Sequence, residues 1–296
     1  MRDAVLRVFE SNENKIVIGD ALRALKELPS DCVDLIFADP PYNIGKDFDG
    51  VNDKIDEKQF LEWCYEWLTE CARVLKPSGS FYLMNSTQNM PALDLWCRDR
   101  FSILSRIVWA YDSSGVQAKR FFGSMYEPML HMVADPKCYT FNASDILIEA
   151  KTGAKRGLID YRKNPPRPYN TTKVPGNVWE YPRVRFKMEE YENHPSQKPE
   201  ALLDRVIRAS SNPGDLVLDP FAGSFSTAAV ASRLGRRTLS FEINEAYLPI
   251  GLRRLRIQSD LPAEALIKQR RRKTQNLSKR QRERDLIEQP VLKLEL

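Results

Sequence analysis

The sequence predicts an α/β protein in which a mostly parallel sheet is covered by helices on both faces. Short apolar runs typical of buried strands alternate along the chain with amphipathic runs typical of helices. Apolar residues make up 42% of the 296 residues, which is enough to bury a large core. Acidic residues also follow several of the predicted strands, as they do where a ligand binds at one edge of a parallel sheet.

Each element has its own sequence signal. The predicted strands are apolar runs bounded by polar or turn residues, and they cover 15–20, 32–39, 80–85, 216–219 and 237–244. The predicted helices carry apolar residues on one face, and they cover 21–28, 58–75, 200–211 and 225–235. A proline ends the first helix, the sequence KPSG is expected to end the second, and Gly235 to cap the last. Residues 112–127 and 150–193 break this alternation.

Composition excludes several classes of protein. No stretch approaches the about 20 apolar residues of a membrane span, and residues 1–10 hold no apolar signal region, so we expect a cytoplasmic protein. Five scattered cysteines without a C-x-x-C pair predict free core thiols. With only two histidines, neither near a cysteine pair, no metal site is expected.

Positive charge is concentrated in two segments. Residues 268–284 hold nine Lys and Arg against one acid, and residues 151–187 hold ten against two, so each segment carries +8. The whole chain carries only +5, so the remainder carries −11. An acidic body with two basic segments favours a polyanionic partner contacted at defined places, although such runs are also common as solvated surface.

Two loops at strand ends carry residues suited to ligand binding and catalysis. Asp20, Asp39, Asp219 and Glu242 each lie at or near the carboxyl end of a predicted strand, where open parallel sheets bind ligands. After Asp219 the loop PFAGS offers small residues that allow close backbone approach, but no phosphate-binding lysine. Glu242, 23 residues after Asp219, is placed to hydrogen-bond the ribose of a nucleoside. Together they favour S-adenosylmethionine over ATP.

The sequence DPPYN after the second strand suits an exocyclic amine on a flat ring. Such a ring would stack on Tyr42, while Asp39 and the carbonyl of Pro40 accept hydrogen bonds from the amine. The prolines fix the backbone, so both acceptors are positioned in advance. The alternative is a tight Pro-Pro turn with a surface tyrosine.

These motifs also carry a family resemblance. DPPYN upstream, with NHPSQKP and DPFAGS downstream, resembles the β group of DNA amino-methyltransferases, and within it the adenine N6-methyltransferases of the YhdJ type. Other similar stretches are SRIVWAYDSSGVQAKR, SMYEPML, GLIDYRKNPP and KVPGNVWEYPRVR. The resemblance implies a Rossmann-like class I S-adenosylmethionine-dependent methyltransferase fold with circularly permuted motifs and a recognition insertion. One departure is Phe225, where the wider family has glycine.

The resemblance also implies roles for individual residues. Asp39, Pro40, Pro41 and Tyr42 would be catalytic. The residues implied to bind S-adenosylmethionine are Asp20, Ser196, Gln197, Lys198, Asp219, Phe221, Ala222, Gly223, Ser224 and Glu242. The residues expected to contact DNA are Arg162, Lys163, Arg167, Arg183, Arg185, Arg270, Arg271, Arg272 and Lys273.

The expected organisation follows the same division. We expect a catalytic half at 1–149, a target-recognition insertion at 150–192, a cofactor-binding half at 193–260 and a basic tail at 261–296. The partner is expected to be double-stranded DNA at the nucleoid, with base flipping to reach the amine and no membrane contact. A homodimer is left open.

Several other activities fit the sequence less well. No cysteine follows a proline, which excludes cytosine C5-methylation, and the deaminase motifs H-x-E and P-C-x-x-C are absent. Cytosine N4-methylation is the nearest alternative, although that chemistry more often has serine in place of Asp39. Methylation of RNA or of a protein amide is disfavoured by the motif order. A non-catalytic DNA-binding protein on the same fold is the remaining alternative.

Overall fold

A single mixed sheet forms the centre of the molecule. The computed structural model describes residues 6–48, 51–112, 120–151 and 156–261. Within them nine strands pair in the order β1 (Arg7–Glu10), β2 (Asn14–Ile18), β15 (Arg237–Glu242), β14 (Leu216–Asp219), β3 (Val33–Ala38), β6 (Leu75–Met84), β8 (Tyr126–Val133), β7 (Ser102–Ala110) and β13 (Val178–Glu180). Only β1 and β8 in this sheet run against the other strands, so the predicted mostly parallel sheet is confirmed.

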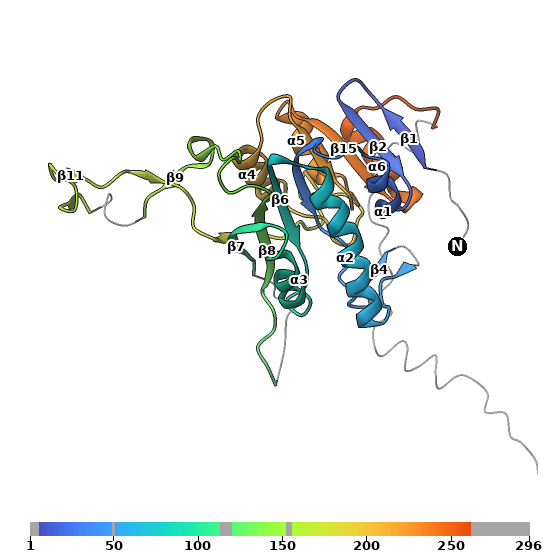
Figure 1. Ribbon diagram of the computed structural model, residues 1–296, viewed down its shortest axis with the longest axis horizontal. Helices are drawn as coiled ribbons and strands as arrows, with labels where there is room; N and C mark the ends of the chain where they lie inside the picture. Colours follow the sequence, from blue (N-terminus) through green and yellow to red (C-terminus); the bar gives the residue numbers. More distant parts are fainter. Residues whose placement is uncertain (1–5, 49–50, 113–119, 152–155, 262–296) are drawn as a thin grey trace, which may run out of the picture.

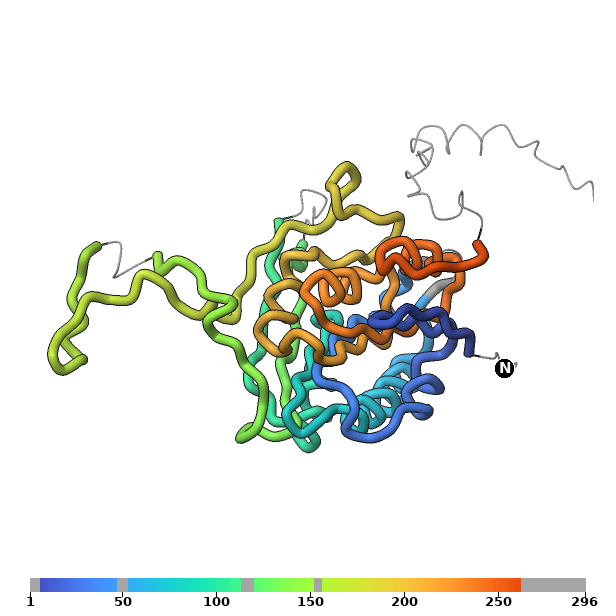
Figure 2. Tube along the Cα trace, turned by 90° about the horizontal axis from the view of Figure 1, so that it is seen from above, coloured from blue at the N-terminus to red at the C-terminus, as the bar shows by residue number. Residues whose placement is uncertain are grey.

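Helices cover both faces of the sheet, as the sequence predicts (Figure 2). One layer consists of α1 (Ala21–Lys26), α2 (Glu57–Val74) and α3 (Met90–Cys97), and its largest buried side chain is Trp67. The other layer consists of α4 (Glu200–Ser210), α5 (Ser226–Arg233) and α6 (Leu248–Leu255). The strong apolar stripe of α2 explains why the expected helix at 58–75 forms almost unchanged.

The turn expected at KPSG is absent. The extended backbone of Leu75 ends α2 and begins β6 at once, so Pro77 and Gly79 lie inside a strand. A Cβ atom on Gly79 would lie 2.6 Å from the Leu75 side chain and 3.0 Å from the carbonyl oxygen of Asp34. Glycine therefore lets β6 approach β3 closely at the point where their pairing register shifts.

A narrow arm leaves the body beside β7 and β8 (Figure 1). It begins with the pair β9 (Ile148–Glu149) and β12 (Thr172–Lys173), and continues into the pair β10 (Ile159–Asp160) and β11 (Arg167–Pro168). The arm begins at β9, just before the predicted insertion 150–192, and ends at β12 within it, whereas β13 in the same range belongs to the main sheet. The reason is Trp179, which is buried against the strand β7.

The remaining elements are short. They are the hairpin β4 (Asp47–Phe48) with β5 (Val51–Asn52), and the two 3₁₀ helices η1 (Ala143–Ile146) and η2 (Glu245–Tyr247). No helix in the described ranges is long and apolar enough to cross a membrane. All five cysteines are free thiols, but Cys138 is exposed rather than part of the core and Cys32 is half-buried.

Candidate active site

Four acidic residues lie at one edge of the sheet, as the sequence predicts. Asp20, Glu242, Asp219 and Asp39 follow or end β2, β15, β14 and β3, which are adjacent parallel strands. Asp20 is exposed and accepts a hydrogen bond of 2.9 Å from the backbone N–H of Arg23, so it also caps α1. The other three carboxyl groups are shielded from water and face the space beyond the strand ends.

A cavity of about 460 Å³ opens beside the end of β3. Asp39, Pro40 and Tyr42 line one side of it, and aromatic residues from β7 and β8 line another. The segment that leads into α4 closes the cavity, with Ser196, Gln197 and Lys198 in its wall. The structure therefore brings DPPYN and NHPSQKP, which are about 155 residues apart, to the same cavity.

Two carboxylates and one ammonium group meet in this cavity. The Nζ atom of Lys198 forms an ion pair with Oδ2 of Asp39 and lies 3.4 Å from Oε2 of Glu127. The hydroxyl oxygen of Tyr42 lies 2.6 Å from Oδ1 of Asp39 and 3.0 Å from the same oxygen of Glu127. Exposed fractions of 8%, 14% and 17% for the Lys198, Asp39 and Glu127 side chains show that water barely reaches the cluster.

Burial sets the electrostatics of the site. It raises the pKa of Asp39, and the ammonium group of Lys198 offsets part of that rise. Burial opposes the charge on Lys198, but the carboxylates of Asp39 and Glu127 outweigh it and raise the pKa of Lys198. Burial also raises the pKa of Asp219 to about 7, although Thr227 and the backbone N–H of Phe221 donate hydrogen bonds to it. Burial therefore disfavours ionisation of the carboxyl groups, and Lys198 is the cation that stabilises the charged form of Asp39.

Lys198 and Gln197 also have partners within the protein. The resemblance assigns both to cofactor binding, and here Lys198 contacts Asp39. Gln197 accepts a hydrogen bond from the backbone N–H of Glu192 and donates one to the carbonyl of Glu190. Its amide therefore organises the chain that closes the cavity.

The loop after β14 is held by the acid at the end of β15. The backbone N–H of Gly223 donates to Oε2 of Glu242 over 2.7 Å, and that of Asn244 donates to Oε1 over 2.8 Å. Burial raises the pKa of Glu242, and these N–H groups offset part of the rise. The Phe221 ring packs edge-on against Trp67 of α2, with centroids 5.0 Å apart.

Gly223 has a left-handed backbone and no room for a side chain. Its φ is +50°, and a Cβ atom there would lie 2.7 Å from the ring of His194. Burial lowers the pKa of His194 to about 3, so the imidazole is neutral at physiological pH. The sequence suggests no role for His194, but the structure places it between the two motif loops, against Gly223.

The substitution at Phe225 is accommodated by a neighbouring glycine. Phe225 precedes α5 with φ +57°, a left-handed conformation that favours glycine, yet its ring is fully buried. A Cβ atom on Gly251 of α6 would lie 2.9 Å from that ring and 2.7 Å from Ile16. The missing side chain of Gly251 therefore makes space for the phenylalanine.

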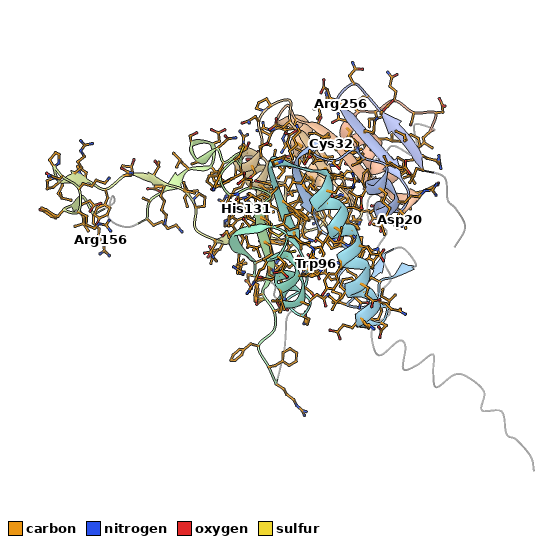
Figure 3. All side chains as sticks on the ribbon, in the orientation of Figure 1. Asp20, Cys32, Trp96, His131, Arg156 and Arg256 are labelled. Atoms are coloured by element: carbon orange, nitrogen blue, oxygen red, sulfur yellow. The ribbon has the colours of Figure 1, made fainter. Side chains whose placement is uncertain are left out.

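The basic residues predicted to contact DNA are spread over two regions. Arg162, Lys163 and Arg167 are exposed on the arm, and Arg156 lies near its outer end (Figure 3). Arg162 is held by Asp160 in an ion pair of 2.8 Å. Two others lie nearer the cavity: Arg183 lines it, with its guanidinium 5.2 Å from the ring centre of Tyr111, and Arg185 donates to the carbonyl of Asp112. Four more lie outside the described residues: Arg270, Arg271, Arg272 and Lys273.

Sequence reasoning missed several residues of the cavity wall, namely Lys46, Trp109, Tyr111 and Glu127. Glu127 carries a usable signal, because it interrupts the apolar strand YEPMLHMV with a charged side chain. A carboxylate at such a position is half-buried by its neighbours and needs a partner. Trp109 and Tyr111 give no comparable signal, because aromatic residues in or beside strands usually indicate packing, and Lys46 is a lysine in a loop with no surrounding motif.

Comparisons with known proteins agree with this geometry. The family model described as DNA methylase matches residues 33–253. The DNA adenine methyltransferase YhdJ of Escherichia coli (strain K12) is 64% identical over 272 residues, which are 92% of each chain. The type II methyltransferase M.HpaI of Haemophilus parainfluenzae is 35% identical over 246 residues, covering 82% of this chain and 74% of that one.

Solved structures share the fold at low identity. The cytosine-N4-specific PvuII DNA methyltransferase superimposes with a TM-score of 0.66 at 17% identity, over 86% of this chain and 90% of that chain. A complex of M1.HpyAVI with SAM superimposes with a TM-score of 0.54 at 22% identity, over 82% and 99%. The predicted Rossmann-like methyltransferase fold is confirmed.

Proposed function

Because this chain belongs to the DNA methylase family, we propose that it transfers a methyl group from S-adenosylmethionine to the N6 amine of an adenine in a specific DNA sequence. One observation carries the proposal: Asp39, Pro40 and Tyr42 line a cavity of about 460 Å³ next to the Gly223 loop. The relative with 64% identity, named a DNA adenine methyltransferase, supports adenine as the base.

The strand-end acids suit S-adenosylmethionine. Glu242 accepts hydrogen bonds from the backbone N–H groups of Gly223, Asn244 and Ile243, so its carboxylate, with about four acceptor sites, has room for a ribose hydroxyl. Asp39 supplies negative charge near a sulfonium, and Lys198 is a cation for an amino-acid carboxylate. Asp219 has a pKa of about 7, so a nearby sulfonium would favour its ionised form. When bound, the cofactor supplies an electrophilic methyl group. Within the described ranges, no group of three or more His, Cys, Asp or Glu is placed to hold a metal ion.

The catalytic loop would hold the target base by its amine. The carboxylate of Asp39 and the carbonyl of Pro40 accept the two amine hydrogens, and the ring of Tyr42 stacks on the base. Both acceptors draw the amine away from conjugation with the ring, which exposes the nitrogen lone pair. Because Pro40 and Pro41 restrict the backbone, the acceptors need little rearrangement on binding.

Duplex DNA is the proposed substrate. An adenine inside the stack cannot reach a cavity lined by Tyr42, so the base must be flipped out at a cost of a few kcal/mol. Exposed cations of the arm, together with Arg183 and Arg185, are the proposed source of compensating contacts. Genomic DNA as substrate implies work in the cytoplasm, at the nucleoid.

Product analysis tests this proposal. Duplex DNA is incubated with the protein and labelled S-adenosylmethionine and then digested to nucleosides. We expect label in N6-methyl-2′-deoxyadenosine. Label mainly in N4-methyl-2′-deoxycytidine would replace adenine by cytosine as the target. In a parallel reaction with RNA in place of DNA, label in the RNA but not in the DNA would overturn the substrate class. Absence of any label, with cofactor binding intact, would favour a non-catalytic DNA-binding protein.

A further inference from the structure

Two carboxylates in the cavity compete for the same two donors. The Tyr42 hydroxyl is within hydrogen-bond distance of both Asp39 and Glu127, at 2.6 and 3.0 Å. The Lys198 ammonium group also contacts both. A single oxygen of Glu127, Oε2, faces both donors, whereas Asp39 uses Oδ1 for one and Oδ2 for the other. The proposed reaction uses Asp39 and assigns nothing to Glu127.

This arrangement weakens Asp39 for its task. The proposed function requires Asp39 to accept a hydrogen bond from the target amine, and although each of its oxygens keeps a lone pair, each already accepts from one donor. A tyrosine hydroxyl has one hydrogen, so it can donate fully to only one carboxylate at a time. Lys198 is too buried to exchange Asp39 for water without a large desolvation cost. A second acceptor for the two donors would therefore make Asp39 a stronger partner for the amine when the base arrives.

We propose that Glu127 is a positioning residue that takes over the Tyr42 hydroxyl and the Lys198 ammonium group while Asp39 binds the amine of the target base. This inference rests on the proposed function. Both donors already contact Glu127, so the exchange requires shifts of less than 1 Å rather than a new arrangement. Glu127 thereby also keeps Tyr42 oriented at the edge of the cavity where the base stacks.

Glu127 is held firmly enough for this role. It lies on β8, where its backbone pairs with Trp109 of β7. The hydroxyl of Tyr111 adds a further hydrogen bond to its carboxylate. Lys198 lies 6.0 Å from the ring centre of Trp109 and 5.5 Å from that of Tyr42, so the aromatic rings also confine the cation. A carboxylate that only caps a helix or forms a surface ion pair would not need to be enclosed by aromatic rings in this way.

The pH dependence of catalysis gives a specific readout. Glu127 is one of the groups that raise the pKa of Asp39, so a neutral glutamine there lowers that pKa. The acidic limb of kcat, where Asp39 becomes protonated, should move to lower pH. The other charged or titratable groups near the pair remain in place, and they are Lys46, Lys198, Tyr42, Tyr111, Arg183 and Asp219.

The experiment compares Glu127→Gln with Glu180→Gln. Glutamine keeps the size of Glu127 and removes its charge, and Glu180 is an exposed glutamate on β13, the edge strand of the same sheet. We expect kcat of Glu127→Gln to fall about 10- to 100-fold, the size of one charge-assisted hydrogen bond. Affinity for S-adenosylmethionine, measured by calorimetry without DNA, should stay within about twofold because the variant keeps Lys198. Glu180→Gln should match the wild type.

Each outcome has a distinct meaning. A lower kcat with an acidic limb shifted to lower pH, and with unchanged cofactor affinity and Tm, supports the inference. Wild-type kcat in Glu127→Gln overturns it, because the donors would then need no second carboxylate. Parallel losses of kcat, cofactor affinity and Tm also overturn it, because they indicate a structural role. If the wild-type protein methylates no DNA, the proposed function itself has failed.

Discussion

Lys198 contacts Asp39 across 159 positions of sequence, and it also has Glu127 within 3.4 Å. This second carboxylate means that removal of Asp39 does not leave the buried ammonium group without a partner. We therefore expect Asp39→Ala to fold and to bind S-adenosylmethionine. Loss of the amine acceptor should reduce methyl transfer about 10- to 100-fold, since a hydrogen bond to a charged group contributes about 1.5–3 kcal/mol.

Asp39→Asn is the matched variant for this prediction. It keeps one acceptor oxygen and loses the charge, so its activity should lie between those of the wild type and Asp39→Ala. Single-turnover methylation with excess enzyme measures the transfer step directly. Wild-type transfer by Asp39→Ala would contradict the role of Asp39.

Phe225 and Gly251 should be energetically coupled. Gly251→Ala places a methyl group against the Phe225 ring, and overpacking of this kind costs about 1–3 kcal/mol. In a Phe225→Ala background the ring is gone, and the same change should cost less or stabilise α6, because alanine favours helix by about 1 kcal/mol over glycine. Urea denaturation of the wild type, the two single variants and the double variant gives the coupling free energy between the two residues. Additive effects would show that the two residues do not share this space.

Arg167 should contribute to DNA binding without contributing to catalysis. It is exposed on β11 of the arm and does not line the cavity. If it contacts one phosphate, Arg167→Ala should reduce the slope of log K against log salt by about 0.9. Lys58→Ala is the control, because Lys58 is an equally exposed cation on α2. A change in the preferred sequence would show that Arg167 reads a base instead.

Asp219 should make the protein less stable as pH rises. Its pKa is about 7 in the folded protein against an ordinary 3.8, so the folded state binds the proton more tightly. The stabilisation is complete below about pH 4 and is lost as pH rises through 7, by up to about 4 kcal/mol. Asp219→Asn, which cannot ionise, should remove that part of the decline. If the free energy of unfolding fell equally with pH in the wild type and in Asp219→Asn between pH 4 and 8, this prediction would be wrong.

The strand-end acids were predictable because parallel strands with short apolar runs bring their carboxyl ends to one edge. That rule alone predicts that Asp39, Asp219 and Glu242 lie at the same edge of the sheet. The partners of Asp39 were not predictable in the same way. Glu127 reaches the cavity because β8 returns antiparallel between β6 and β7, and no local pattern encodes that insertion. Similarly, β13 is too short to show the alternation of buried and exposed side chains that indicates a strand. Its place in the sheet depends on the buried Trp179.

The arm is joined to the body by few contacts, and these lie at its two ends. Before it, the Asn142 side-chain amide donates to the carbonyls of Arg208 and Ser211 at the end of α4. After it, Trp179 is buried beside β7. A segment closed in this way can double in length for only about 0.6 kcal/mol of additional loop entropy. If the arm contacts DNA as we propose, we expect target preference to diversify within residues 148–173 while the residues around the cavity stay constant.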